Sequence, residues 1–441
     1  MPRLLSALAS AARRLLPEVC FSPQNLTPAR RRLLLASAML AAAITLAGQS
    51  AVAESRDTSH WTASWGTAMA GPPPDASLQT FDNQTVRLVV QASLGGNRVR
   101  IRLSNEMGTT PLQVGAARIG LRAQGSDVAP GSDRALTFSG RAGVTIPPGA
   151  PALSDPVELH LPPLASVAVS LYLPGTVQAT TLHSLALQTG YVSPPGDHTA
   201  SASLPVARTI AAWPFLTALE VDGAGSAIVV LADSLTDGTR STPDANRRWT
   251  DVLARRLQGE RGPAARIAVI NRGISANRLS SNSPANPLAG QNAQARFERD
   301  VLSTSGVRQV VLFVGINDIG NSAAASPLTF EDMVAGYRQL IARAHAARIA
   351  VIGATLAPFE GAAYYSAEKE ALRQAVNAWI RASGEFDAVL DADRILRDPA
   401  RPGRLLPAYD SGDHLHPNDR GYQALGEAAV PVVLQPGAGL R

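Results

Sequence analysis

Residues 227–238 read Ala-Ile-Val-Val-Leu-Ala-Asp-Ser-Leu-Thr-Asp-Gly and decide the fold class of the C-terminal half. The first five are apolar and rich in β-branched side chains, which indicates a short strand buried on both faces. A polar turn follows at once, and Ser234 stands in it. A serine held on such a turn can act as a nucleophile and offer its backbone N–H to a developing negative charge. It can equally cap the helix that follows.

Three more short apolar runs repeat the pattern, at residues 267–270, 310–314 and 349–352. Between the last two, apolar side chains recur at helical spacing, and Thr329 with Asp332 predicts a capped helix start. Strands that alternate with helices predict a parallel sheet covered by helices on both faces. In such sheets the functional groups gather at the carboxyl ends of the strands.

The second and third strands end in residues that suit this edge. Gly273 ends the second, where glycine permits close approach of the backbone to a substrate, although glycine also marks ordinary turns. Asn317 follows the third and carries an amide N–H₂ where an oxyanion would sit, and Asp318 can fix that loop. Asn and Asp are also common turn residues, so each signal is weak by itself.

A polar loop near the C-terminus supplies the base that a serine nucleophile needs. Residues 410–418 read Asp-Ser-Gly-Asp-His-Leu-His-Pro-Asn, and His416 stands three residues after Asp413. Imidazole is suited to accept a serine proton, and a carboxylate on its other nitrogen sets the tautomer. The same residues fit a helix N-cap or a metal site with His414. A metal is disfavoured because no fourth ligand is evident, so neither metal nor cofactor is expected.

The N-terminal half shows a different pattern. From residue 61 to residue 204, short runs alternate apolar and polar side chains with period two, separated by Gly-, Pro- and Asn-rich turns. This is typical of an antiparallel sandwich or jelly roll. We therefore expect a β-sandwich domain at residues 54–206, a connector at 207–224 and an α/β domain at 225–441.

Residues 1–53 are expected to be a signal peptide. Three arginines (30–32) precede an apolar run from Leu33 to Gly48, and Ala51-Val52-Ala53 forms a small-x-small cleavage pattern. The run is shorter than a membrane span. We expect cleavage after Ala53, export to the periplasm or medium by the general or twin-arginine route, and no membrane span in the mature chain.

The leader also explains the basic charge of the chain. It holds six of the 40 basic residues and one of the 35 acidic residues, which leaves 34 of each in the remainder. A mature chain with no net charge gives no support to nucleic acid as a partner.

Taken together, the four strand-end blocks resemble the SGNH (GDSL-type) hydrolase family, whose blocks carry Ser, Gly, Asn and His in that order. They match here as Ser234, Gly273, Asn317 and His416, with Asp413 in the Asp-x-x-His motif. The resemblance covers roughly residues 225–434. Thr236-Asp237-Gly238 and the run from Gly315 to Gly320 sharpen it toward secreted bacterial esterase- or lipase-like members, in which a β-sandwich commonly precedes the catalytic domain.

The resemblance implies a flavodoxin-like parallel sheet and a serine esterase. Ser234 would attack an ester carbonyl, His416 would take the serine proton and Asp413 would orient His416. The oxyanion would be met by the backbone N–H groups of Ser234 and Gly273 and the side chain of Asn317. The substrate would be a small-molecule or glycan ester.

One residue departs from the family pattern, because Ala232 replaces the glycine that usually precedes Asp-Ser. We expect strain at this turn and not inactivation.

Two alternatives remain for the function: a carbohydrate O-acetylesterase or O-acetyltransferase, and a binding protein whose catalytic domain has decayed. The other five histidines (60, 160, 183, 198 and 345) have no acidic or cysteine neighbours at ligand spacing, and His160 and His345 are expected to be structural or solvated.

Overall fold

Strand β16 (Ser226–Ala232) lies inside a five-stranded parallel sheet with the order β17-β16-β18-β19-β20. The computed structural model describes residues 60–74, 78–283, 285–323, 325 and 327–435, so the expected signal peptide at 1–53 lies outside the described residues. The other strands of this sheet are β17 (Ile267–Gly273), β18 (Val307–Phe313), β19 (Ala350–Ala354) and β20 (Ala388–Leu390).

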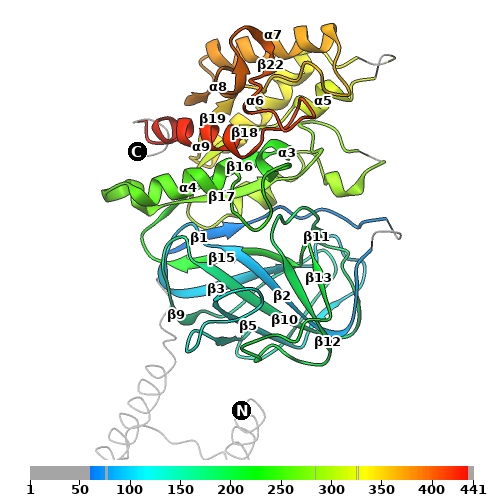
Figure 1. Ribbon diagram of the computed structural model, residues 1–441, viewed down its shortest axis with the longest axis vertical. Coiled ribbons are helices and arrows are strands. Elements are labelled where there is room, and N and C mark those ends of the chain that lie inside the picture. Colours follow the sequence, from blue (N-terminus) through cyan, green and yellow to red (C-terminus); the bar gives the residue numbers. More distant parts are fainter. Residues whose placement is uncertain (1–59, 75–77, 284, 324, 326, 436–441) are drawn as a thin grey trace, which may run out of the picture. The chain divides into compact units, whose positions relative to one another are not determined.

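Helices cover both faces of the parallel sheet (Figure 1), as the alternation of strands and helices predicts. On β16, Val229 and Leu231 belong to a hydrophobic cluster that includes α6 and α7, whereas Ile228 and Val230 belong to another that includes α4 and α9. Both faces of the parallel sheet are therefore covered by apolar side chains. The helices are α3 (Ser234–Asp237), α4 (Trp249–Gly259), α5 (Ile316–Gly320), α6 (Phe330–Ala346), α7 (Ala367–Ala382), α8 (Ala392–Leu396) and α9 (Asp419–Val433).

Local sequence signals fix where these helices begin. Thr329 caps α6: its side chain accepts from the N–H of Asp332, and the Asp332 carboxylate accepts from the N–H of Thr329, as predicted. Asn418 caps α9: its side-chain oxygen accepts from the N–H groups of Arg420 and Gly421. A hairpin of β21 (Arg397–Asp398) and β22 (Arg401–Leu405) follows α8. Within the described part of the chain, no helix has the length and apolar character needed to cross a membrane.

The N-terminal region consists mainly of two antiparallel sheets, which confirms the expected all-β region. One contains β1 (Trp61–Gly66), β15 (Leu216–Asp222), β3 (Gly96–Ser104), β8 (Pro151–Leu153) and β9 (Val157–Leu161). The other contains β13 (Arg208–Ile210), β12 (Gly190–Pro195), β2 (Thr80–Gln91), β10 (Ser166–Gln178), β5 (Ala116–Leu121) and β6 (Arg134–Leu136). Side chains from both sheets share one hydrophobic cluster, as in a sandwich.

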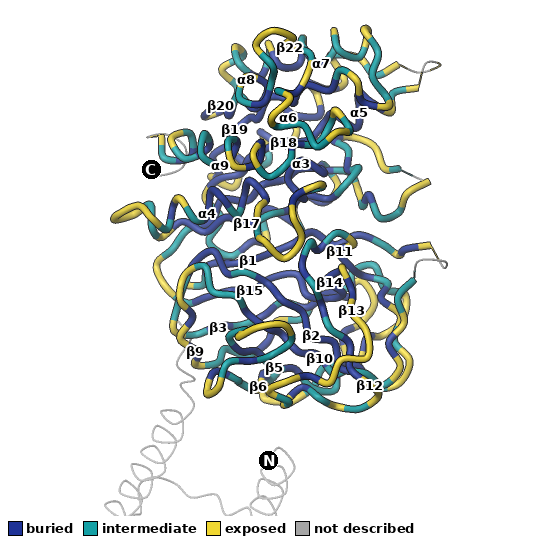
Figure 2. The backbone as a smooth tube through the Cα atoms, in the orientation of Figure 1, coloured by how far each residue is buried: buried dark blue, intermediate teal, exposed yellow. Residues whose placement is uncertain are grey.

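Two small pairs of strands complete this region. They are β4 (Leu112–Val114) with β7 (Val144–Ile146), and β11 (Leu182–His183) with β14 (Trp213–Pro214). Figure 2 shows the central strands of both regions as largely buried and the connecting loops as largely exposed.

The expected connector at residues 207–224 is wrong, because most of it is sheet. β13, β14 and β15 occupy this stretch, and β15 pairs with β1 on one side and β3 on the other. Its polar residues are buried with partners: the Glu220 carboxylate receives the guanidinium of Arg100 at 2.7 Å. Burial on both faces removes the polar outer side by which strands are recognised in a sequence.

Candidate active site

The turn after β16 presents Ser234 as the first residue of α3. Asp233 is the N-cap, since its carboxylate accepts from the N–H of Leu235 at 3.0 Å, and Gly238 ends the helix in the left-handed region with φ of 99°. Ser234 is therefore not the capping residue of this helix. Its hydroxyl is free for another partner.

That partner is His416, on the loop before α9. Nε2 of His416 lies 2.9 Å from Oγ of Ser234, and Nδ1 lies 2.8 Å from a carboxylate oxygen of Asp413. A carboxylate oxygen can only accept, so Nδ1 carries the hydrogen and the Nε2 lone pair faces the serine hydroxyl. This tautomer can remove a proton from Ser234. The three residues expected to act together are thus joined by two hydrogen bonds.

Asp413 is held as a carboxylate by its own loop. Burial opposes ionisation, but the backbone N–H groups of His416 (2.8 Å) and Leu415 (3.1 Å) and the His416 ring hold the pKa of Asp413 well below its ordinary value. Arg240 adds an N–H at 3.2 Å from the oxygen that His416 contacts. Asn418, the last residue of this loop, is the N-cap of α9, so Asp413 and His416 are not the capping residues.

Gly273 does not have the role expected for it. Its backbone N–H donates to the side-chain oxygen of Asn271 at 2.8 Å and is occupied at the end of β17. A Cβ at this position would lie 2.3 Å from the backbone nitrogen of Asp237. Glycine is therefore needed for close packing of β17 against the Ser234 turn, and the structure does not support its N–H as an oxyanion donor.

Three residues further on, Ala276 presents a backbone N–H that has no acceptor among the described residues. Its φ of 64° lies in the left-handed region, which is uncommon for a residue with a Cβ and occurs often at functional sites. The next residue, Asn277, accepts a hydrogen bond from the side-chain amide of Asn317 at 3.1 Å. The loop from Gly273 to Ser280 thus brings Ala276 beside the expected oxyanion donor Asn317.

Buried charged residues support this loop. The Asp318 carboxylate accepts from the N–H groups of Leu279 (2.7 Å) and Ser280 (3.1 Å), and burial raises the pKa of Asp318 to about 6. The fully buried guanidinium of Arg296 donates to the side-chain oxygen of Asn277 and, at 2.8 Å, to the carbonyl of Ala232. Sequence reasoning missed Arg296, because no local pattern distinguishes it from a surface arginine.

Ala232 shows no strain. It continues β16 in register with Gly273 and Phe313, has no positive φ, and its side chain is buried in the cluster that contains α4 and α9. The expectation of strain at this turn is wrong, because the methyl group points into a hydrophobic core.

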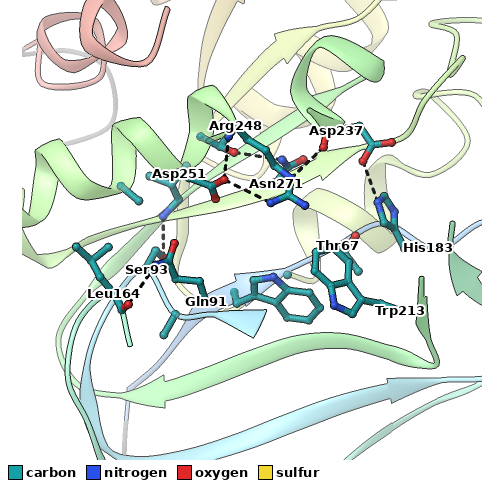
Figure 3. Close-up of a pocket in the computed structure, with 16 residues that line it drawn as sticks. Thr67, Gln91, Ser93, Leu164, His183, Trp213, Asp237, Arg248, Asp251 and Asn271 are labelled. Atoms are coloured by element: carbon teal, nitrogen blue, oxygen red, sulfur yellow. Dashed lines mark hydrogen bonds and ion pairs between the residues drawn. The ribbon is translucent and has the colours of Figure 1, made fainter. Parts of the chain in front are cut away.

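The five other histidines are not part of the Ser234–His416 contact. His160 contacts Asn97, and His345 contacts Asp387 on the surface of α6. His183 is buried on β11 and contacts Asp237 of the Ser234 turn (Figure 3), a partner 54 positions away that no spacing rule could reveal. Among the described residues, no cluster of His, Cys, Asp and Glu has the arrangement of a metal site.

Comparisons with known proteins identify one matching family and several similar structures. The model of the GDSL-like lipase/acylhydrolase family matches residues 233–424. Similar solved structures include an acetylxylan esterase from Geobacillus stearothermophilus, with 20% identity, TM-score 0.36 and coverage of 50% of this chain and 99% of that chain. Another is a carbohydrate acetylesterase from Sinorhizobium meliloti, with 18% identity, TM-score 0.37 and coverage of 47% of this chain and 97% of that chain. A search of the curated proteins found no match. Residues 233–424, which include Ser234, Asn317, Asp413 and His416, are therefore similar to the GDSL-like lipase/acylhydrolase family.

Proposed function

We propose that this protein hydrolyses carboxylic esters with Ser234 as nucleophile, His416 as general base and Asp413 as the residue that orients His416. The observation that carries the proposal is the unbroken line of hydrogen bonds from Asp413 through His416 to Ser234, at 2.8 and 2.9 Å. Intact reactive groups in contact also favour an enzyme over a binding protein with a decayed site.

The reaction follows from these contacts. Ser234 Oγ attacks the acyl carbon while His416 Nε2 takes the serine proton, and a tetrahedral oxyanion forms. The carbon–oxygen bond to the alcohol then breaks, and His416 returns its proton to the departing oxygen. Water, activated by His416 in the same way, releases the acid and restores Ser234.

We propose that three groups meet the oxyanion: the N–H of Ser234, the N–H of Ala276 and the side-chain amide of Asn317. Ala276 takes the place that the family resemblance implies for Gly273, because its N–H has no acceptor among the described residues, whereas that of Gly273 is bound to Asn271. Preorganised donors of this kind lower the barrier because they need no reorganisation when charge develops.

The decisive experiment is Ser234→Ala, with Ser383→Ala at the end of α7 as a matched control. We expect the Ser234 variant to lose p-nitrophenyl acetate hydrolysis and fluorophosphonate labelling with an unchanged circular dichroism spectrum, and the control to behave as wild type. Near wild-type turnover by folded Ser234→Ala would reject the proposal. Longer acyl esters and acetylated xylan, assayed in parallel, assign the acyl chain and separate a simple esterase from a carbohydrate deacetylase.

We also propose that the enzyme acts after export. The support is the order of basic, apolar and small residues across positions 30–53. The test is the N-terminal sequence of the protein recovered from a bacterial periplasm or culture medium. A mature start at Glu54 is expected, and an uncleaved chain retained in the cytoplasm would contradict the proposal.

A further inference from the structure

We infer that His183, contributed by the β-sheet region, is a positioning residue for the hydrolase site and acts through the carboxylate of Asp237. The inference rests on the proposed function, since it assigns a role within that reaction. In this role, a residue of the N-terminal region contributes to catalysis. His183 fixes the separation of the two backbone N–H groups that meet the oxyanion.

His183 is buried, with 3% of its surface exposed, and its hydrogen-bond partners among the described residues are all oxygen atoms. Nδ1 lies 2.9 Å from the carbonyl oxygen of Ala68, and Nε2 lies 2.9 Å from a carboxylate oxygen of Asp237 and 3.1 Å from the carbonyl of Leu185. The ring therefore bridges the backbone of the β-sheet region, at Ala68 and Leu185, and the side chain of Asp237.

Asp237 joins the two halves of the proposed oxyanion site. It is the last residue of α3, which begins at Ser234, and its second carboxylate oxygen accepts from both the backbone N–H and the hydroxyl of Ser275, each at 2.8 Å. Ser275 directly precedes Ala276. The Asp237 side chain thus holds the loop that carries the Ala276 N–H against the helix that carries the Ser234 N–H.

Within the described residues, His183 is the only group that contacts the first oxygen of Asp237. Arg248 is near, but its side chain binds the backbone carbonyl of Asp237, the carbonyl of Ala186 and the Asp251 carboxylate. Figure 3 shows the side chain of His183 joined to Asp237 by a dashed line, whereas the side chain of Arg248 lies beside Asp251 and Asn271. Loss of the imidazole would leave one oxygen of a buried carboxylate unpaired, and the side chain would turn away from Ser275.

Replacement of His183 would displace the N–H of Ala276 and would leave the reactive side chains in place. Ser234, His416 and Asp413 keep their mutual contacts when His183 is replaced, because none of them touches His183. Catalysis falls because a misplacement of about 1 Å in a positioned group can lower the rate by about 10²-fold. Substrate binding in the ground state changes less, because the oxyanion donors act on the charge that develops in the transition state.

The test compares His183→Leu, His183→Gln and His183→Asn in the full chain, with His345→Gln as a matched control. His345 also contacts a carboxylate, Asp387, at 2.9 Å, but on the surface of α6. The quantity measured is kcat for p-nitrophenyl acetate per Ser234 titrated with a fluorophosphonate. A role in stability alone lowers the amount of active enzyme and leaves this ratio unchanged.

We expect His183→Leu to lower kcat per titrated site by at least about 10-fold with KM within about threefold of wild type. Glutamine should restore most of kcat, because its amide N–H reaches Asp237, whereas the shorter asparagine should not. The control should match wild type. If the leucine variant does not fold, the glutamine and asparagine pair decides: equal, wild-type kcat for both would overturn the inference. A wild-type protein without turnover or Ser234 labelling would instead reject the proposed function.

Discussion

Two loops border Ser234, and they contribute in different ways. The loop before α9 (residues 409–418) supplies side chains, His416 and Asp413, and its own backbone N–H groups hold the Asp413 carboxylate. The loop after β17 (residues 273–280) supplies a backbone N–H, that of Ala276, and side chains from other segments hold it.

This difference separates contacts within one loop from contacts between segments that are distant in the sequence. A reactive side chain must be a particular residue, and its partner can stand three positions away on the same loop. A backbone donor can belong to any residue except proline, so its chemistry depends on where the fold puts it. The loop before α9 should therefore fail when its own residues change, and the loop after β17 when distant residues change.

The largest effect is expected from Asp413→Asn, which changes one of the reactive residues of the loop before α9. An amide at this position donates to Nδ1 of His416 and favours the tautomer that cannot take the serine proton, so kcat should fall by roughly 10⁴-fold. Hydrolysis of p-nitrophenyl acetate by protein of confirmed fold measures this. Arg240→Ala removes the other donor to the same oxygen and should retain most activity. A decrease below tenfold for Asp413→Asn would contradict the assigned role.

Next in size is a pH-dependent effect of Asp233→Asn, which tests the helix start between the two loops. Burial raises the pKa of Asp233 from 3.8 to about 7 in the folded protein. Between these values the folded state binds more protons than the unfolded state, so wild-type stability falls as pH rises through this window. Asparagine caps equally well and carries no charge. Between pH 4 and pH 8, the free energy of unfolding of the variant should therefore rise relative to that of wild type by at most about 4 kcal/mol.

Urea unfolding at several pH values checks this prediction. Asp332→Asn at the start of α6 is the control with the opposite sign, because hydrogen bonds from Thr329 lower the pKa of Asp332. Wild type should lose stability relative to that variant as pH falls through the folded-state pKa of Asp332. Parallel pH profiles for Asp233→Asn and wild type would show that Asp233 is not protonated in the folded state.

A smaller effect is expected from Asn317→Ala, which removes the side-chain donor beside the loop after β17. The decrease in kcat should be about 10²-fold, equivalent to about 3 kcal/mol of transition-state stabilisation, with KM nearly unchanged. Asn321→Ala, at the other end of α5, is the matched control because its amide donates to the carbonyl of Asn317, its one partner among the described residues. If both variants have the same kcat, Asn317 does not contact the oxyanion.

The smallest effect belongs to Ala276→Gly. Glycine relieves the left-handed conformation, which costs alanine about 1 kcal/mol, but it also makes the unfolded chain more flexible by a similar amount. The free energy of unfolding should thus change by less than about 1 kcal/mol, and kcat should remain, because the N–H is retained. Ala276→Val, with a β-branched side chain at the same φ, should be clearly less stable in thermal unfolding.

The comparison of the loops also explains what the sequence could predict. The parallel sheet and the cap at Thr329 follow from periodicity and residue type. The meeting of Ser234, His416 and Asp413 follows from residue type together with the resemblance to the SGNH family. Gly273 is the right kind of residue in the wrong role, because the side chain of Asn271 takes its N–H. Ala276, Arg296 and His183 give no signal, since their importance comes from contacts across the fold. The sequence pattern does not reveal β15, because the polar residues of this strand are buried with partners.

Arg272 carries one more consequence. Its guanidinium leaves the end of β17 and donates to the carbonyls of Thr67 and Thr217 in the antiparallel region, and burial lowers its pKa to about 10. A chain cut near residue 225 would keep the charge and lose both acceptors. Heating should therefore unfold residues 60–435 in a single calorimetric transition, because the two regions form one cooperative unit.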